Sequence, residues 1–144
     1  MFRFQRSLAA VRMRIHALRQ LYRKVRTELT KDARGLQLMR DWLSPDQRAE
    51  FDEKGTFEVV GCDSGKRYRI CHGQAANVFE IDDAGQLKVC LCFIPYGQLV
   101  AGDVMLAQKI ALETDENGAL AVAYRFVPLA RRVGRRSRFF RPPL

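Results

Sequence analysis

The segment FQRSLAAVRMRIHALRQLYRKVRTEL, residues 4–29, decides the fold of the N-terminal part of the chain. Its apolar residues recur at alternating intervals of four and three, and neither Pro nor Gly interrupts them. This heptad spacing places them on one face of a single amphipathic helix, about 39 Å long at 1.5 Å per residue. We expect the helix to end or bend at Gly35. The residues of this face, called the apolar seam below, are Phe4, Leu8, Val11, Ile15, Leu18, Tyr22, Val25 and Leu29.

The charge of the chain is unevenly distributed. The 144 residues carry a net charge of +9, of which residues 1–34 contribute +8 and residues 124–144 contribute +7. The middle of the chain, residues 35–123, is therefore acidic and sums to −6. Basic ends of this kind favour an anionic partner, namely nucleic acid, an acidic protein or a membrane surface. The alternative is that the basic ends fold back onto the acidic middle.

Three arginines flank the apolar seam at heptad intervals. With Leu8 at position a of the heptad, Arg12, Arg19 and Arg26 all fall at position e, and we call them the basic stripe. The stripe would face itself in an antiparallel homodimer, and in a parallel one Arg14 would face Arg19, so we expect no homo-oligomer through this helix. The seam would instead cover the protein's own acidic domain, an acidic partner helix or an anionic membrane surface. The residues predicted to contact a partner helix are Leu8, Val11, Ile15, Leu18, Tyr22 and Val25.

After Gly35 the pattern changes from one long helix to shorter elements. Residues 36–43 predict a second, short helix. Ser44-Pro45-Asp46-Gln47 has the composition of a capping box, which predicts another helix start, and Gly55 is placed to end that helix. Alternating runs separated by Asp- and Gly-rich turns then predict two hairpins and an antiparallel meander. The four predicted strands are 57–60, 67–70, 77–81 and 87–94, with turns at 62–65 and 82–85.

The last predicted helix lies over residues 104–114, with Asp103 as its cap, and should pack across the sheet. We expect a turn over 115–118 and a fifth strand through the alternating residues of 120–126. The polar stripe of this helix is predicted to be Lys109, Glu113 and Glu116.

These elements predict an α+β fold in three parts. Residues 1–34 form a basic amphipathic helix, residues 35–128 an α+β domain of four to five antiparallel strands with one helix packed across them, and residues 129–144 a basic, flexible tail.

The stretch from Arg67 to Glu113 resembles a family of small uncharacterised proteins of bacteria and their phages. The resemblance implies a shared fold and carries no activity with it. It rests on Arg67-Tyr68-Arg69-Ile70, Gly73, Asn77-Val78, Leu91-Cys92 with Pro95, the run from Asp103 to Lys109, and Ala111-Leu112-Glu113.

The candidates for metal binding and catalysis are weak. Structural zinc sites pair their ligands two to four residues apart, and only Cys90 and Cys92 come close to this pattern; Cys62 and Cys71 lie at opposite ends of their hairpin. We therefore expect reduced thiols, no metal and no cofactor, with zinc held by Cys90 and Cys92 as the alternative.

No motif with a catalytic mechanism is present. The loop 61–67 has three residues between its glycines where a phosphate-binding loop needs four, and it precedes a strand, so we interpret it as a hairpin turn. The two histidines, His16 and His72, have no neighbours that suggest a nucleophile and its base. The sequence therefore indicates a non-enzymatic protein.

The leading functional prediction is a binding module that holds an anionic polymer, with nucleic acid as the first candidate, without sequence selectivity. The alternative is an assembly or adaptor subunit that docks its heptad helix on a partner protein; a zinc-stabilised or membrane-surface protein comes third. We expect a cytoplasmic location, because no apolar segment reaches membrane-spanning length and arginines interrupt any secretory signal, although an Arg-rich start is also typical of an organelle transit peptide. The predicted nucleic-acid contacts are Arg12, Arg19, Arg23, Lys24, Arg26, Arg131, Arg132, Arg135, Arg136 and Arg138.

Overall fold

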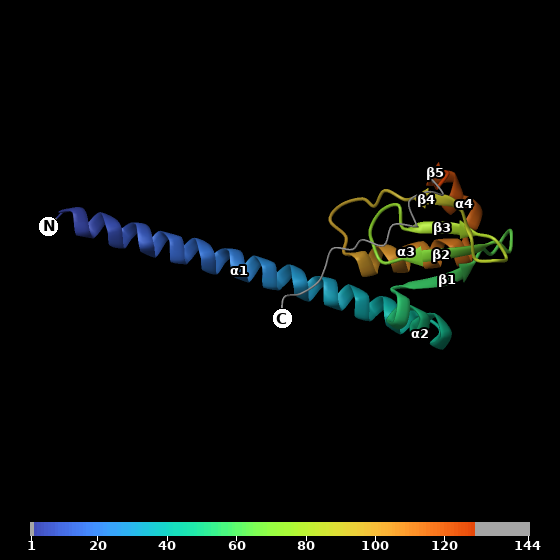
Figure 1. The fold of residues 1–144 in the computed structure, drawn as a ribbon, viewed down its shortest axis with the longest axis horizontal. Helices are drawn as coiled ribbons and strands as arrows, with labels where there is room; N and C mark the ends of the chain where they lie inside the picture. The colour runs from blue at the N-terminus through green and yellow to red at the C-terminus, as the bar shows by residue number, and fades with distance from the viewer. Residues whose placement is uncertain (1, 129–144) are drawn as a thin grey trace, which may run out of the picture.

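The computed structural model describes the backbone of residues 2–128 and the side chains from Val11 to Pro128. One long helix, α1 (Phe2–Trp42), leads into a domain of three further helices and a five-stranded antiparallel sheet (Figure 1). The predicted α+β class is confirmed.

The sequence predicts that α1 ends or bends at Gly35; the helix does not end there but continues to Trp42. The predicted second helix over 36–43 is the last part of α1. Gly35 is required here for packing, because a Cβ atom built on it would overlap the side chain of Val100, just before α3 (Ala101–Thr114). Gly102 of α3 is required in turn, because a Cβ atom there would overlap backbone atoms of Gly35. The predicted division after residue 34 falls within this helix, where its side chains change from exposed to buried.

The helix α2 (Pro45–Lys54) has the capping box that the sequence predicts. The Ser44 hydroxyl accepts a hydrogen bond from the Gln47 backbone N–H, and the Gln47 side chain accepts one from the Ser44 N–H. Gly55 ends the helix with φ of 70°, a left-handed conformation that favours glycine. Both boundary predictions are confirmed.

The strands of the sheet lie side by side in chain order, and each pairs antiparallel with the next. The two predicted hairpins are β1–β2 and β3–β4, and both are confirmed. The strands are β1 (Thr56–Val60), β2 (Arg67–Cys71), β3 (Val78–Ile81), β4 (Leu87–Cys92) and β5 (Tyr124–Phe126).

The region after α3 differs from the prediction. The expected turn over 115–118 is the first turn of a helix, α4 (Glu116–Val122), which Asp115 caps by accepting a hydrogen bond from the Gly118 N–H. The fifth strand therefore contains only Tyr124–Phe126. The alternation from Leu120 to Phe126 favours a longer strand, but the cap at Asp115 starts a helix that includes Leu120 and leaves Val122 70% exposed.

The start and the polar face of α3 were also predicted wrongly. The helix begins at Ala101 after Val100, which makes no side-chain capping bond, so Asp103 lies in its first turn and does not cap it. Lys109 is 9% exposed, and Glu116 belongs to α4 and is fully buried. Lys109 can be buried because it pairs with Glu113 one turn further along α3, and Glu116 because donors elsewhere in the fold satisfy it.

The hydrophobic core lies between one face of the sheet, α3 and the C-terminal end of α1. The sheet contributes Phe57, Tyr68 and Ile70, while Met105 comes from α3 and Met39 from α1; all five are fully buried. Packing of α3 across the sheet is thus as predicted. The end of α1 is an integral part of the core, whereas the rest of α1 is not.

Candidate docking helix

The N-terminal two-thirds of α1 projects away from the domain (Figure 1). Every side chain from Val11 to Arg34 is exposed, and burial begins only at Gly35. From Val11 onward, the seam therefore does not cover the protein's own domain, which was one of the alternatives that the sequence left open.

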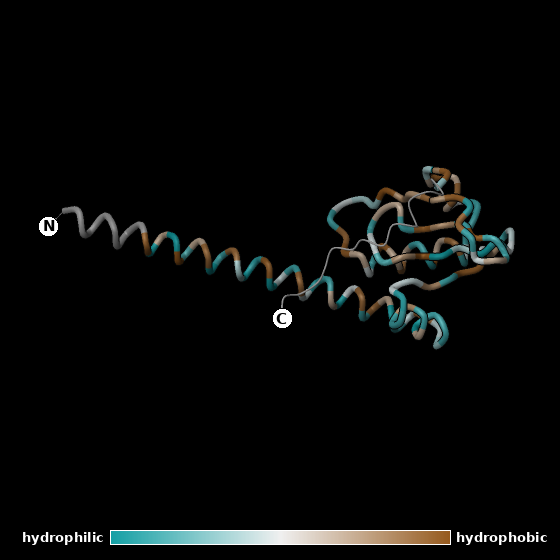
Figure 2. Tube along the Cα trace, in the orientation of Figure 1, coloured by the Kyte–Doolittle hydropathy of each residue, from teal (hydrophilic) through white to brown (hydrophobic). Residues whose placement is uncertain are grey.

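The apolar seam is open to solvent. Apolar positions recur along the projecting part of α1 in Figure 2. Burying a side chain of this size is worth about 1.5–3 kcal/mol, so a row of them in water points to an interaction surface. The exposed fractions are Val11 47%, Ile15 46%, Leu18 66%, Tyr22 70%, Val25 49% and Leu29 64%. The side chains of Phe4 and Leu8 lie outside the described residues.

The same heptad positions continue into the domain, where they are covered. Leu36 and Leu43 occupy position a and Met39 occupies position d of the register that runs through the seam. Leu36 is half-buried, Met39 is 0% exposed and Leu43 is 4% exposed. One face of α1 is thus core at its C-terminal end and bare along most of its length. Asp32, at position d, separates the two parts.

The helix can extend into solvent without support for two physical reasons. Between Val11 and Arg34 it contains mainly Arg, Leu, Ala, Gln and similar residues of good helix propensity, with no Gly or Pro. Its docked end also supplies a formed nucleus, so each further residue adds a hydrogen bond without the cost of nucleation.

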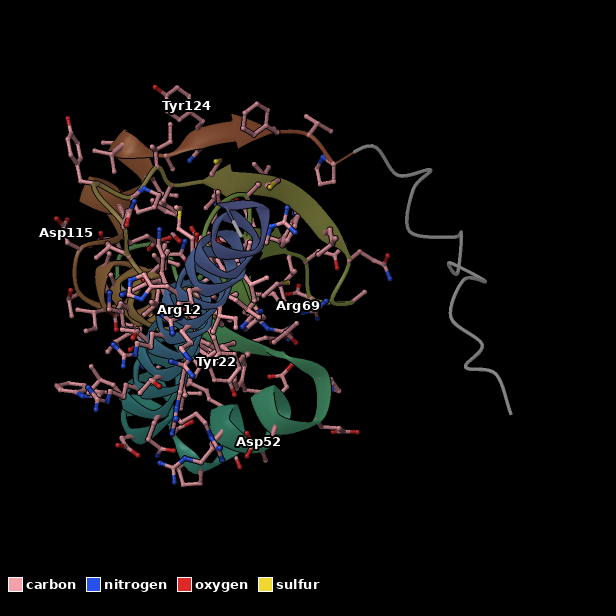
Figure 3. All side chains as sticks on the ribbon, turned by 90° about the vertical axis from the view of Figure 1, so that its left-hand side faces the viewer. Arg12, Tyr22, Asp52, Arg69, Asp115 and Tyr124 are labelled. Atoms are coloured by element: carbon pink, nitrogen blue, oxygen red, sulfur yellow. The ribbon has the colours of Figure 1, made fainter. Side chains whose placement is uncertain are left out.

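The predicted basic contacts of α1 are all exposed. Figure 3 looks along the molecule from the N-terminal end of α1, with Arg12 and Tyr22 labelled on the helix. Within the described part of the chain, the basic stripe and its neighbours Arg23 and Lys24 form no ion pair; the one pair on this stretch joins Lys31 to Glu28 at 3.5 Å. Five predicted contacts lie outside the described residues: Arg131, Arg132, Arg135, Arg136 and Arg138.

A polar site lies at the end of the sheet that is away from the projecting part of α1 (Figure 1). There the loop between β1 and β2 surrounds the side chain of Glu116. The backbone N–H groups of Asp63 and Ser64 donate to Glu116 Oε2 at 2.9 and 2.7 Å, and the hydroxyls of Ser64 and Tyr68 donate to Oε1. Gly61 leaves room for the carboxylate, which a Cβ atom there would overlap. The loop does bind an anion through its backbone, but the anion is the protein's own Glu116.

The electrostatics of this site follow from its hydrogen bonds. Burial by itself would raise the pKa of Glu116, but the bonds from Ser64, Tyr68 and the two backbone N–H groups outweigh it and lower the pKa to about 2. Burial and the adjacent Glu116 carboxylate raise the pKa of Tyr68. Both groups are thus held in the protonation states that favour their mutual hydrogen bond. Sequence reasoning missed this site, and the glycine-rich composition of the loop was the only signal of it.

The thiols are not arranged for metal binding or catalysis. Among the described residues, no three His, Cys, Asp or Glu side chains are placed to hold a metal ion. Burial raises the pKa of Cys71 and of Cys90, the opposite of what a nucleophilic thiolate needs. Purified protein is expected to contain no stoichiometric zinc; elemental analysis that finds one zinc per chain, lost together with the fold in chelator, would instead make Cys90 and Cys92 ligands.

An apolar cavity of about 220 Å³ lies between the β4–α3 loop, α3 and α4. Phe93, Leu99, Ala107 and Val122 are among its lining residues, and its one polar side chain, Gln108, is already paired with Asn77 at 2.9 Å in both directions. Small-molecule sites usually measure about 300–1,000 Å³ and offer unpaired polar groups. This cavity is smaller than that, and its polar side chain is already paired, so it is not a small-molecule site of the usual kind.

Comparison with protein-family models, with curated proteins and with solved structures finds no match. The resemblance to small bacterial and phage proteins therefore stays a prediction. Among the described residues, no helix has both the length and the apolarity needed to cross a membrane.

Proposed function

We propose that this protein is a non-enzymatic assembly or adaptor module that binds a partner macromolecule along the exposed seam of α1. The observation that carries the proposal is the contrast along one helix face. Its heptad positions are 46–70% exposed from Val11 to Leu29 and become core from Met39 onward. The domain holds the end of the helix firmly and leaves the rest of the same face available for a partner.

The exposed seam supports docking through apolar contacts more strongly than binding through charge alone. Phosphate contacts would engage the basic stripe but leave six large apolar side chains in water. A surface that combines an apolar row with flanking arginines is typical of helix-in-groove and helix–helix recognition.

Replacing Leu18 with Asp is expected to abolish partner binding without affecting the domain. The side chain is 66% exposed, so the change should shift the free energy of unfolding by less than about 0.5 kcal/mol. A charge in the middle of the seam would have to be buried on docking, which should weaken binding by at least about 100-fold. Pull-down of the partner by the wild type and by Leu18→Asp measures the loss of binding, and thermal melting of both proteins measures the change in stability. Thr27→Asp, on the opposite face of α1, is the control and should retain binding.

Nucleic-acid binding is the second candidate, supported by the exposed basic stripe of α1, which forms no ion pair in the described part of the chain, and by the six arginines after Pro128. It predicts non-specific binding whose affinity falls steeply with salt, by about 0.7–0.9 log units per log unit of salt for each phosphate contact. Removing the residues after Pro128 should then reduce this slope by the amount that three to five phosphate contacts contribute. Fluorescence anisotropy with single-stranded RNA and duplex DNA measures it. Absence of salt-sensitive binding at low ionic strength would end this candidate and leave protein docking.

A further inference from the structure

We infer that the partner of α1 is an acidic amphipathic helix of another protein, which pairs with the seam as a two-stranded coiled coil. This inference rests on the proposed docking function and names the chemistry of the partner. It follows from the length of the bare seam, from where the seam is blocked and from the charges along its edge.

The length and the end of the site are set by the fold. From Val11 to Leu29 the described seam spans about 27 Å at 1.5 Å per residue, enough for nearly three heptads of a partner helix. Beyond Gly35 the same face is occupied by α3, whose first turn meets α1 at Gly102. A partner helix would therefore pack on α1 before Gly35, in the part that α3 leaves uncovered. Asp32 sets the C-terminal end of this docking surface, because it replaces an apolar residue at position d.

The charge of the partner follows from the basic stripe. Position e faces position g of a parallel partner or position e of an antiparallel one, so Arg12, Arg19 and Arg26 would meet three partner residues spaced seven apart. None of the three arginines has an ion-pair partner in the described part of the chain. Acidic residues at those three partner positions would neutralise the stripe, whereas basic ones would repel it.

The other occupants fit less well. The protein's own domain leaves residues 11–34 exposed, and a second copy would place arginine opposite arginine. A membrane surface or a nucleic acid would satisfy the charges, but neither requires residues at heptad spacing over nearly three heptads. Each is a distinct outcome of the test.

The test uses two designed three-heptad peptides with identical apolar seams, one with Glu and one with Lys at all flanking positions. Titration calorimetry of each against the full chain should show binding of the Glu peptide, with the Lys peptide weaker by about tenfold or more for three lost pairs. The variant Arg12→Glu, Arg19→Glu, Arg26→Glu should reverse this preference. The matched control Arg23→Glu, Lys24→Glu, Lys31→Glu changes the net charge equally but lies away from the seam edge, and it should keep the preference for Glu.

Several results would overturn the inference. Equal affinity for the two peptides, or an unchanged preference after the stripe is reversed, would show that the stripe does not select the partner. Binding to anionic lipid vesicles or to RNA with no binding of either peptide would identify a different occupant. The Leu18→Asp variant distinguishes the proposed docking function from the inferred acidic partner. If Leu18→Asp loses the natural partner while the triple Arg→Glu variant keeps the wild-type peptide preference, docking through the seam is supported and an acidic partner helix is contradicted.

Discussion

Replacing Glu116 with Ala is expected to lower the free energy of unfolding by about 3–5 kcal/mol, a large part of the stability of a domain this size. The carboxylate is fully buried and accepts four hydrogen bonds from Asp63, Ser64 and Tyr68. Without it, two backbone N–H groups and two hydroxyls lose their acceptor, and only weaker links, such as the Asn117 N–H bond to Asp63, still join α4 to the β1–β2 loop. Urea denaturation followed by circular dichroism measures the change.

Two further variants separate this explanation from a general effect of lost charge. Glu53→Gln removes a carboxylate from an exposed position of α2 and should change the stability by less than about 0.5 kcal/mol. Gly61→Ala keeps Glu116 but adds a Cβ atom that overlaps its carboxylate, and should destabilise the domain as well. If Glu116→Ala costs no more than Glu53→Gln, then the carboxylate does not hold this end of the domain together.

The same site predicts how stability depends on pH. The pKa of Glu116 is about 2 in the folded protein and near 4.5 when unfolded. Its contribution is therefore complete above pH of about 4.5 and is lost as the pH falls through that window towards 2. Glu116→Gln removes the titrating group, so its stability should fall less steeply than that of the wild type between those values. Parallel slopes for the two proteins would contradict the assignment.

Much of the fold could be predicted because its signals are local. The heptad of α1, the capping box at Ser44 and the left-handed glycine after α2 each act within a few residues of themselves. The two hairpins likewise follow from turn composition between alternating strands. None of these elements depends on knowing what lies across the fold.

The errors occurred where contacts distant in the sequence decide the structure. Gly35 has the composition of a helix end, but its contact with Gly102, far along the chain, gives it a packing role inside the C-terminal part of α1. Glu116 reads as a solvent-exposed residue of a polar stripe, yet the loop at Ser64 supplies it with donors. Short-range patterns contain no information on either pairing.

The residues of the apolar seam could be identified from the sequence, but the exposure of their side chains to solvent could not. The spacing of the seam identifies the face of α1, and the sequence places the basic stripe beside it. The sequence cannot tell whether such a face packs on its own domain, because Leu18 and Met39 follow the same heptad; only the structure shows that one is exposed and the other is core.

Replacing Gly102 with Ala is expected to destabilise the domain by about 2–4 kcal/mol, even though Ala is the better helix former by about 1 kcal/mol. The added Cβ atom would overlap backbone atoms of Gly35 and Leu36, which cannot rotate away as a side chain could. The helices α1 and α3 would have to move apart and leave Met39 less well packed. Ala107→Ser, which adds one atom at an exposed position of α3, is the control and should change the stability by less than about 0.5 kcal/mol.

The Gly102→Ala variant also tests how the projecting part of α1 stays helical. If the docked end nucleates the helix, loosening it should reduce the helical signal of residues far from Gly102, because the first turn must then form without support. Far-ultraviolet circular dichroism should therefore show a loss of helix before the sheet melts, and the acidic peptide should bind more weakly because part of its free energy must reform α1. An unchanged spectrum together with full peptide affinity would mean that the seam is helical by its own propensity, and that the crossing of α1 and α3 serves the domain alone.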